Sequence, residues 1–165
     1  MQFSAREVMT QRYHTLTPGH TVAEAVRLFK TASQDEGRRI YGMMVTDGNG
    51  KLVGMISMYD IMLFIRPKHI NVWGMMEDID ISGLMDRACA RTQTIRVGDI
   101  MSTELISVTP DTHVLTLLDI MINKHVRRIP VLEEGQILGM VYISDLFFHL
   151  LDKLDDEPRL PGATP

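Results

Sequence analysis

The sequence predicts an α+β fold made of two copies of one unit, each with a short strand, a helix, a two- to three-stranded sheet and a closing helix. Three observations support this fold. A strand–turn–strand–helix pattern occupies residues 125–150, the same pattern occupies residues 41–64, and the segments upstream of the two patterns also align. A repeat that keeps its register in two separate segments indicates a tandem duplication.

The later pattern has two apolar runs, Ile129–Leu132 and Ile137–Ile143, which are parted by Glu133-Glu134-Gly135. Two such runs around a short glycine-containing turn predict a β-hairpin. Ser144-Asp145 follows and opens an apolar pattern at helical spacing. Serine and aspartate at this place are typical of a helix N-terminus.

The earlier pattern repeats these features. Gly54 and Asp60 correspond to Gly139 and Asp145 at one constant offset. At a second constant offset, Met9-Thr10 corresponds to Met101-Ser102, and Thr17-Pro18 corresponds to Thr109-Pro110. The first copy therefore carries an insertion between its first helix and its hairpin, around Ser33 to Arg39.

Each copy resembles a CBS motif, the module named after cystathionine β-synthase, and the pair resembles a Bateman module. The resemblance is carried by Val8-Met9-Thr10, Ile100-Met101-Ser102, both Thr-Pro pairs, Arg128-Ile129-Pro130-Val131, and the segments Gly54–Asp60 and Gly139–Asp145. It implies that the two copies pack pseudo-symmetrically. The expected organisation is motif 1 over residues 1–66, a connecting segment over 67–96, motif 2 over 97–153 and a flexible tail over 154–165.

In the first copy, residues 1–12 form a lead-in that the resemblance places beside the motif that follows it. A strand is expected at Tyr13–Leu16, followed by a helix from Thr21 to about Ala32, because Thr21 and Glu24 match the capping-box pattern. The hairpin strands are expected at about 40–46 and 51–57, and the closing helix at 58–65.

In the connecting segment, apolar residues recur at helical spacing at Ile81, Leu84, Met85 and Ala88. This pattern predicts an amphipathic helix that covers one edge of the fold; a dimer or partner contact is the alternative. In the second copy we expect a strand at 105–108, a helix cap at Asp111-Thr112 and a helix at 114–124.

The composition is that of a globular protein. The chain has 165 residues, of which 45% are hydrophobic and 23% charged, and its formal net charge of −4 predicts no general attraction to nucleic acid. No apolar run approaches the roughly 20 residues of a membrane helix, and no signal peptide is evident. We therefore expect a cytoplasmic protein with no membrane insertion. The 13 methionines are expected mainly in the core, with a deformable pocket wall as the alternative.

The residues that catalysis or a metal site would require are not signalled. Cys89 is the only cysteine, which excludes an internal disulfide and a thiolate-rich metal site. Histidine occurs at 14, 20, 69, 113, 125 and 149, without ligand spacing. We expect no enzyme, no metal and no required cofactor.

Binding of a nucleotide is better supported. An aspartate at a strand–helix junction can accept hydrogen bonds from a ribose diol, and the helix N-terminus and nearby arginines favour a phosphate. Simple N-capping is the alternative role of Asp60 and Asp145. The resemblance implies two clefts, each combining an aspartate from one copy with a Thr-Pro segment from the other. The main cleft is expected to use Thr17, Val22, Ile40, Tyr41, Arg127, Arg128, Tyr142, Ser144 and Asp145. The second is expected to use Ser57, Tyr59, Asp60, Thr109, Val114 and Val126.

The two clefts are not equivalent. The basic pair Arg127-Arg128 has no counterpart before the first hairpin, where Tyr41-Gly42 stands. We therefore expect one working cleft, the one that contains Asp145. The function expected is a stand-alone regulatory module that binds an adenosine-containing ligand, AMP first and ADP, ATP or S-adenosylmethionine after it. A homodimer and an unidentified regulated protein are the expected partners, and a ligand-free dimerisation or scaffold module is the alternative.

Overall fold

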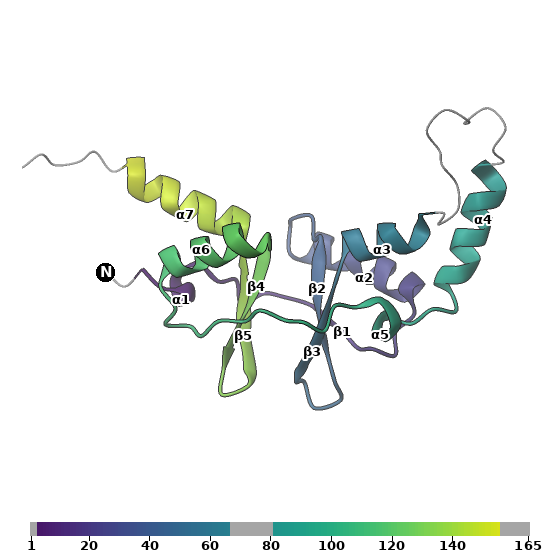
Figure 1. Cartoon of the computed structure of the whole chain (residues 1–165), viewed down its shortest axis with the longest axis horizontal. Coiled ribbons are helices and arrows are strands. Elements are labelled where there is room, and N and C mark those ends of the chain that lie inside the picture. The colour runs from purple at the N-terminus through teal and green to yellow at the C-terminus, as the bar shows by residue number, and fades with distance from the viewer. Residues whose placement is uncertain (1–2, 67–80, 156–165) are drawn as a thin grey trace, which may run out of the picture. The chain divides into compact units, whose positions relative to one another are not determined.

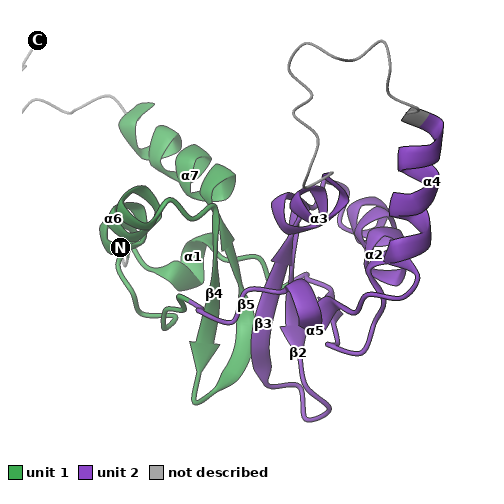
Figure 2. Ribbon diagram, turned by 45° about the vertical axis from the view of Figure 1, so that its right-hand side comes forward, with its two compact units in different colours: residues 1–11, 106–165 green, residues 12–105 purple. Residues whose placement is uncertain are grey.

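The computed structural model describes residues 3–66 and 81–155, except for the side chain of Ile81. The chain divides into two compact units, coloured separately in Figure 2. Unit 1 comprises residues 1–11 and 106–165, and unit 2 comprises residues 12–105. Unit 1 is thus built from both ends of the chain, whereas unit 2 is continuous.

Unit 2 contains a three-stranded sheet in the order β1-β2-β3, formed by β1 (Thr15–Leu16), β2 (Gly42–Thr46) and β3 (Leu52–Ser57). β1 runs parallel to β2, and β2 pairs antiparallel with β3 (Figure 1). The helices of this unit are α2 (Val22–Asp35), α3 (Met58–Ile65), α4 (Ile81–Thr92) and α5 (Val97–Ile100). The core residues Leu16, Met43, Val45 and Ile56 are almost fully buried. All five residues of β2 are buried, because helices and neighbouring strands cover it.

The capping box predicted for α2 is confirmed. The Thr21 hydroxyl accepts from the Glu24 N–H at 3.1 Å, and the Glu24 carboxylate accepts from the Thr21 N–H at 2.7 Å. The helix extends three residues beyond the predicted end, to Asp35. The Ser33 hydroxyl then accepts from the Ile40 N–H at 2.9 Å, which ties the inserted segment to the start of the hairpin.

The helix predicted in the connecting segment is confirmed as α4, which packs on α2. Ala88 is buried, and the Arg91 guanidinium lies 4.4 Å from the centre of the Phe64 ring on α3. Met85, expected on the apolar face, is instead 51% exposed. This helix covers part of unit 2, and the choice between an edge cover and a dimer or partner contact stays a prediction. The rest of the predicted connecting segment before α4, residues 67–80, lies outside the described residues.

Unit 1 contains the antiparallel hairpin of β4 (Arg128–Glu133) and β5 (Gln136–Tyr142), with α1 (Ala5–Val8), α6 (Val114–Lys124) and α7 (Ile143–Asp155). Glu134 and Gly135 both have positive φ (50° and 80°), as a tight two-residue hairpin turn requires. The core is formed by Val8, Leu117, Ile129, Val141 and Leu146, among others. Of the tail predicted from residue 154, residues 154–155 belong to α7 and the rest lies outside the described residues.

Two predictions in this unit are wrong in detail. The expected strand at 105–108 is reduced to a single parallel bridge between Val108 and Val131. The predicted cap at Asp111-Thr112 is replaced by His113, whose side chain accepts from the Leu115 N–H at 3.2 Å. The Thr112 hydroxyl is used elsewhere, since it accepts from the Thr109 N–H at 3.2 Å.

The lead-in does not pack beside the motif that follows it in the sequence, so that expectation is wrong. The Ala5 N–H donates to the Thr112 carbonyl at 2.7 Å, and Thr10 pairs with Met140 on β5. The same contacts recur in unit 2, where the Val97 N–H donates to the His20 carbonyl at 2.8 Å and Ser102 pairs with Met55. Each lead-in therefore completes the unit that contains the other copy's hairpin.

Methionine is divided between core and surface. Met43, Met44, Met121 and Met140 are at most 2% exposed, as expected for core residues. Met58 and Met62, which were grouped with the presumed core, are 39% and 51% exposed on α3. They lie on the outward side of the helix because its buried contact is made by Ile61.

Candidate functional site

The strand–helix junctions carry the predicted site residues. In unit 2, β3 continues directly into α3 at Ser57, which caps the helix. Asp60 occupies the third helical position rather than the cap. Its Oδ2 accepts from the Ser57 N–H at 2.7 Å and from the Ser57 hydroxyl at 2.9 Å. These two bonds fix the orientation of the Asp60 carboxylate at the N-terminus of α3.

Three further predicted residues are placed near this junction. The Tyr41 carbonyl accepts from the Met58 N–H at 2.8 Å, which ties the start of β2 to the start of α3. The side chains of Tyr41 and Tyr59 are 46% and 66% exposed, whereas Ile40 is buried in the core. The unit 2 junction therefore combines one held carboxylate with two exposed aromatic side chains.

The corresponding junction of unit 1 carries the basic residues. Arg128 pairs with Tyr142 across the hairpin, and the Ile143 N–H donates to the Arg127 carbonyl at 2.9 Å. Ser144 and Asp145 lie in the first turn of α7. Five of the predicted main-cleft residues thus come from one end of one hairpin, where two arginines and an aspartate lie close in the fold to the N-terminus of α7. Such a combination suits a phosphate beside a hydroxylated group.

The Thr-Pro segments lie elsewhere in each unit. β1 runs parallel to β2 with Thr15 opposite Met44, so Thr17 follows β1 at the end of β2 that is remote from Tyr41. Thr109 is placed in the same way, because Val108 pairs in parallel with Val131. Within a single unit, therefore, the threonine and the aspartate do not lie side by side.

Besides Ile40, two predicted residues have buried side chains. Val22 and Val114 are at most 1% exposed and belong to the cores of units 2 and 1. Their aliphatic groups are occupied by packing, so a ligand could reach these positions only through the backbone. Val126, which follows the left-handed residue His125 (φ 53°), is partly buried.

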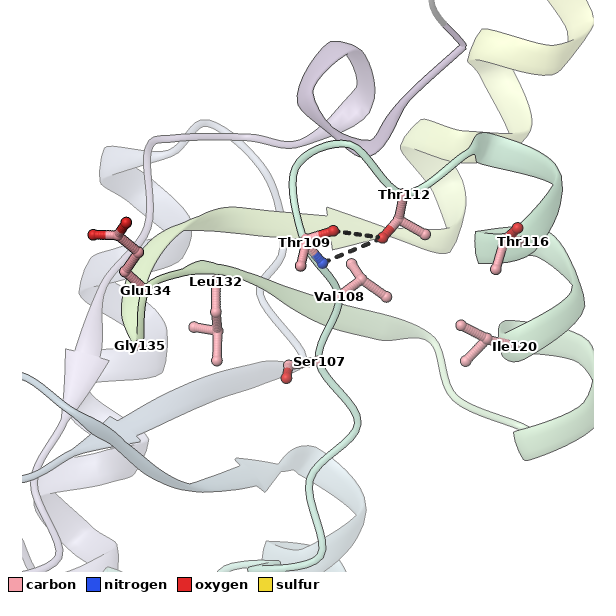
Figure 3. Close-up of a pocket in the computed structure, with 9 residues that line it drawn as sticks. All are labelled: Ser107, Val108, Thr109, Thr112, Thr116, Ile120, Leu132, Glu134 and Gly135. Carbon is pink, nitrogen blue, oxygen red and sulfur yellow. Dashed lines mark hydrogen bonds between the residues drawn. The ribbon is translucent and has the colours of Figure 1, made fainter.

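Unit 1 also contains a pocket of ≈ 490 Å³ that the sequence did not indicate (Figure 3). Hydroxyl groups dominate its polar lining, and its charged member is Glu134; the described lining includes no lysine or arginine. The hydroxyl residues are Ser107, Thr109, Thr112 and Thr116. Thr109 is the one predicted site residue in it. The pocket lies along α6 and the hairpin turn and lacks a basic group for a phosphate.

Comparison with known protein families identifies the family of this chain. The model of the CBS domain matches residues 5–67 and 97–152. The chain belongs to the CBS-domain family. It carries two CBS domains in tandem. The junction of β3 with α3 is the last strand–helix junction of the first domain, and the junction of β5 with α7 is that of the second.

Similar proteins carry the same pair. The chain is 25% identical over 143 residues to the CBS domain-containing protein YhcV of Bacillus subtilis. This alignment covers 87% of this chain and 82% of YhcV. The CBS-pair protein CBSX2 of Arabidopsis thaliana has a similar structure, with a TM-score of 0.71, 21% identity, and 93% and 98% of the two chains covered. A structure of CBSX2 in complex with AMP also matches, with a TM-score of 0.66, 21% identity, and 92% and 98% coverage.

No helix between residues 3–66 and 81–155 is long and apolar enough to cross a membrane. The same ranges contain no cluster of three or more histidine, cysteine or acidic side chains that could hold a metal ion.

Proposed function

We propose that this CBS pair is a regulatory module that binds an adenosine-containing nucleotide, with AMP as the first candidate. The observation that supports the proposal is the backbone of the unit 1 junction, where Arg128 pairs with Tyr142 just before α7 and Asp145 lies in the first turn of that helix. The complex of CBSX2 with AMP supports the same ligand class.

Each group has a role in the proposal. Asp145 accepts hydrogen bonds from the ribose, the arginines bind the phosphate, and the N-terminus of α7 adds a positive partial charge. The set around Asp60 is the weaker candidate, because the uncharged pair Tyr41-Gly42 stands there where the other junction has Arg127-Arg128.

The test is calorimetric titration of the purified protein with AMP, with ADP, ATP and S-adenosylmethionine as competitors. We expect a stoichiometry near one AMP per chain. Asp145→Asn should weaken AMP binding about ten-fold or more, since a hydrogen bond to a charged group contributes about 1.5–3 kcal/mol. Asp60→Asn is the matched control, because it makes the same change at the other junction, and it should leave this affinity within about two-fold.

A folded protein that binds none of these ligands would contradict the proposal. Equal losses in both variants would also contradict the choice of the Asp145 site. A folded protein without ligand binding would instead favour a second function.

That second candidate is a dimerisation or scaffold module without a ligand. It is favoured by the apolar side chains that α7 exposes: Phe147 is 54%, Phe148 63% and Leu154 78% exposed. Large apolar groups gathered on one helix of a soluble domain are typical of a contact surface. A regulatory module that changes its association on binding AMP would use both features.

A further inference from the structure

The pocket of unit 1 has the size of a small-molecule site. Its volume of ≈ 490 Å³ lies within the range of about 300–1,000 Å³ that is typical of such sites. Three segments line it: the loop at 107–112, the first half of α6 and the hairpin turn (Figure 3). Glu134 lies at the end formed by the hairpin turn, and Thr116 and Ile120 lie at the other end, on α6. All three segments belong to unit 1.

Two of the lining hydroxyl groups are not used by the fold. Among the residues that the structure describes, the side chains of Ser107 and Thr116 make no hydrogen bond. A threonine inside a helix often donates to the carbonyl four residues earlier, as Thr31 does on α2 at 3.1 Å. For Thr116 that carbonyl belongs to Thr112 in the loop before α6, and it accepts from the Ala5 N–H at 2.7 Å. Both hydroxyl groups can therefore bond to a ligand without breaking a bond within the chain.

The carboxylate of Glu134 is also uncommitted. Within the described part of the chain it makes no ion pair and no hydrogen bond, whereas the adjacent Glu133 lies 3.4 Å from the Arg6 guanidinium. Because the described lining contains no lysine or arginine, the negative charge of Glu134 has no counter-charge inside the pocket. A cationic group is the natural partner of such a carboxylate, and an anion would be repelled.

The rest of the lining is aliphatic. Val108 is buried, and Ile120 and Leu132 are partly buried. These side chains can pack against the carbon skeleton of a ligand, while the hydroxyl groups serve as donors and acceptors. The pocket thus combines a surface for carbon, neutral hydrogen-bonding groups and one negative charge.

The corresponding positions of unit 2 carry larger side chains that are already hydrogen-bonded. Glu24 stands where unit 1 has Thr116, and its carboxylate completes the capping box of α2. His20 stands where unit 1 has Thr112, and its Nδ1 accepts from the Thr17 N–H at 2.9 Å. The uncommitted hydroxyl groups are therefore a feature of the second CBS domain rather than of the repeat.

We propose that this pocket binds a small hydroxylated amine, with the ammonium group on Glu134, the hydroxyl groups on Ser107 and Thr116, and the carbon skeleton on the aliphatic side chains. The hairpin turn and the start of α7 lie at opposite ends of β4, about 15–20 Å apart by the rise of a strand. The site is therefore separate from the junction that contains Asp145, and the inference does not rest on the proposed nucleotide binding.

The test is an NMR titration of the nitrogen-labelled full chain with three related sugars at neutral pH. Glucosamine carries the amine, the hydroxyl groups and the carbon ring; glucose lacks the amine; glucosamine 6-phosphate adds an anion. Glucosamine should shift the amide signals of the loop at 107–112, of the first half of α6 and of the hairpin turn. Glucose should shift the same signals but bind about two- to five-fold more weakly, the factor expected from an exposed ion pair. Glucosamine 6-phosphate should bind more weakly than glucosamine.

Three variants assign the roles. Glu134→Gln should abolish the preference for glucosamine over glucose. Glu133→Gln is the matched control, because it removes the same charge from the next residue, which does not line the pocket; it should keep the preference. Thr116→Val removes one hydroxyl at nearly constant volume and should weaken glucosamine and glucose equally, by about two- to ten-fold.

Each contrary result would overturn the inference. Glucosamine that leaves these amide signals unchanged up to tens of millimolar would show that the pocket is not a site for this class. A phosphorylated sugar that binds more tightly than glucosamine would contradict the charge argument. Equal losses of preference in Glu134→Gln and Glu133→Gln would attribute the effect to the net charge of the protein and not to the pocket.

Discussion

Thr10 and Met140 exchange two backbone hydrogen bonds. The Thr10 N–H donates to the Met140 carbonyl at 2.8 Å, and the Met140 N–H donates to the Thr10 carbonyl at 3.0 Å. The pairing adds a segment from the start of the chain to β5, one residue after Gly139. In unit 2, Ser102 and Met55 exchange the same two bonds, one residue after Gly54.

The glycine beside this pairing should not tolerate a side chain. A Cβ at Gly139 would lie 2.5 Å from the Thr10 carbonyl oxygen, and backbone cannot give way easily. Gly139→Ala should therefore lower the free energy of unfolding by about 1–3 kcal/mol, as overpacking usually does. Urea denaturation measures this change. At Gly54 the first atom met is Sδ of the flexible Met101 side chain, so Gly54→Ala should cost less; a larger cost there would contradict the argument.

Removal of residues 1–11 should destabilise the second CBS domain more than the first. The lead-in supplies Ala5 and Val8 to the core of unit 1, and both are buried. Hydrogen exchange should show protection lost in β4 and β5 of the shortened chain, while β2 and β3 keep theirs. A loss confined to β2 and β3 would mean that the lead-in serves the domain that follows it.

Arg128 should matter more for a phosphorylated ligand than for its nucleoside. If its guanidinium binds the phosphate, Arg128→Ala should weaken AMP about ten-fold and adenosine by much less. Calorimetric titration of parent and variant with both ligands gives the comparison. Equal losses for AMP and adenosine would indicate a structural role, for example through the strand pairing of Arg128 with Tyr142.

The exposed face of α7 should govern self-association. Phe147 and Phe148 form an edge-to-face pair, with ring centres 5.4 Å apart. If a second copy covers this pair, Phe148→Ser should raise the dimer dissociation constant at least ten-fold without lowering the stability of the chain. Sedimentation velocity over a concentration series measures it. Asp152→Ser, a polar change on the same helix, is the control. If the parent protein is a monomer at all concentrations, the hypothesis that a second copy covers this face is wrong.

The sequence predicted the elements that local signals specify. The capping box of Thr21 and Glu24, the two hairpins and the helix at 114–124 all depend on residues a few positions apart, and the structure contains them. The CBS pair itself followed from the repeat. These features need no knowledge of distant contacts, which explains why a pattern was sufficient.

The failures concern choices between competing partners. Thr112 was expected to cap α6, but its hydroxyl accepts from Thr109, and His113 caps the helix instead. The lead-in was expected beside its nearest motif, but its hydrogen bonds go to Thr112 and Met140, more than a hundred residues away in the chain. Neither choice has a local sequence signal. The assignment of the nucleotide residues stays a prediction that the experiments above test.

The exchange of lead-ins also determines the order in which the two units can fold during synthesis. Residues 12–105 can complete unit 2 as soon as they leave the ribosome, since the unit is continuous in the chain. Unit 1 must wait, because residues 5–10 are made more than a hundred residues before β5. During that interval the apolar side chains of Ala5 and Val8 have no core to enter. The nascent chain therefore carries residues 5–10 without their partners while unit 2 forms, and the second CBS domain closes only after β5 has been made.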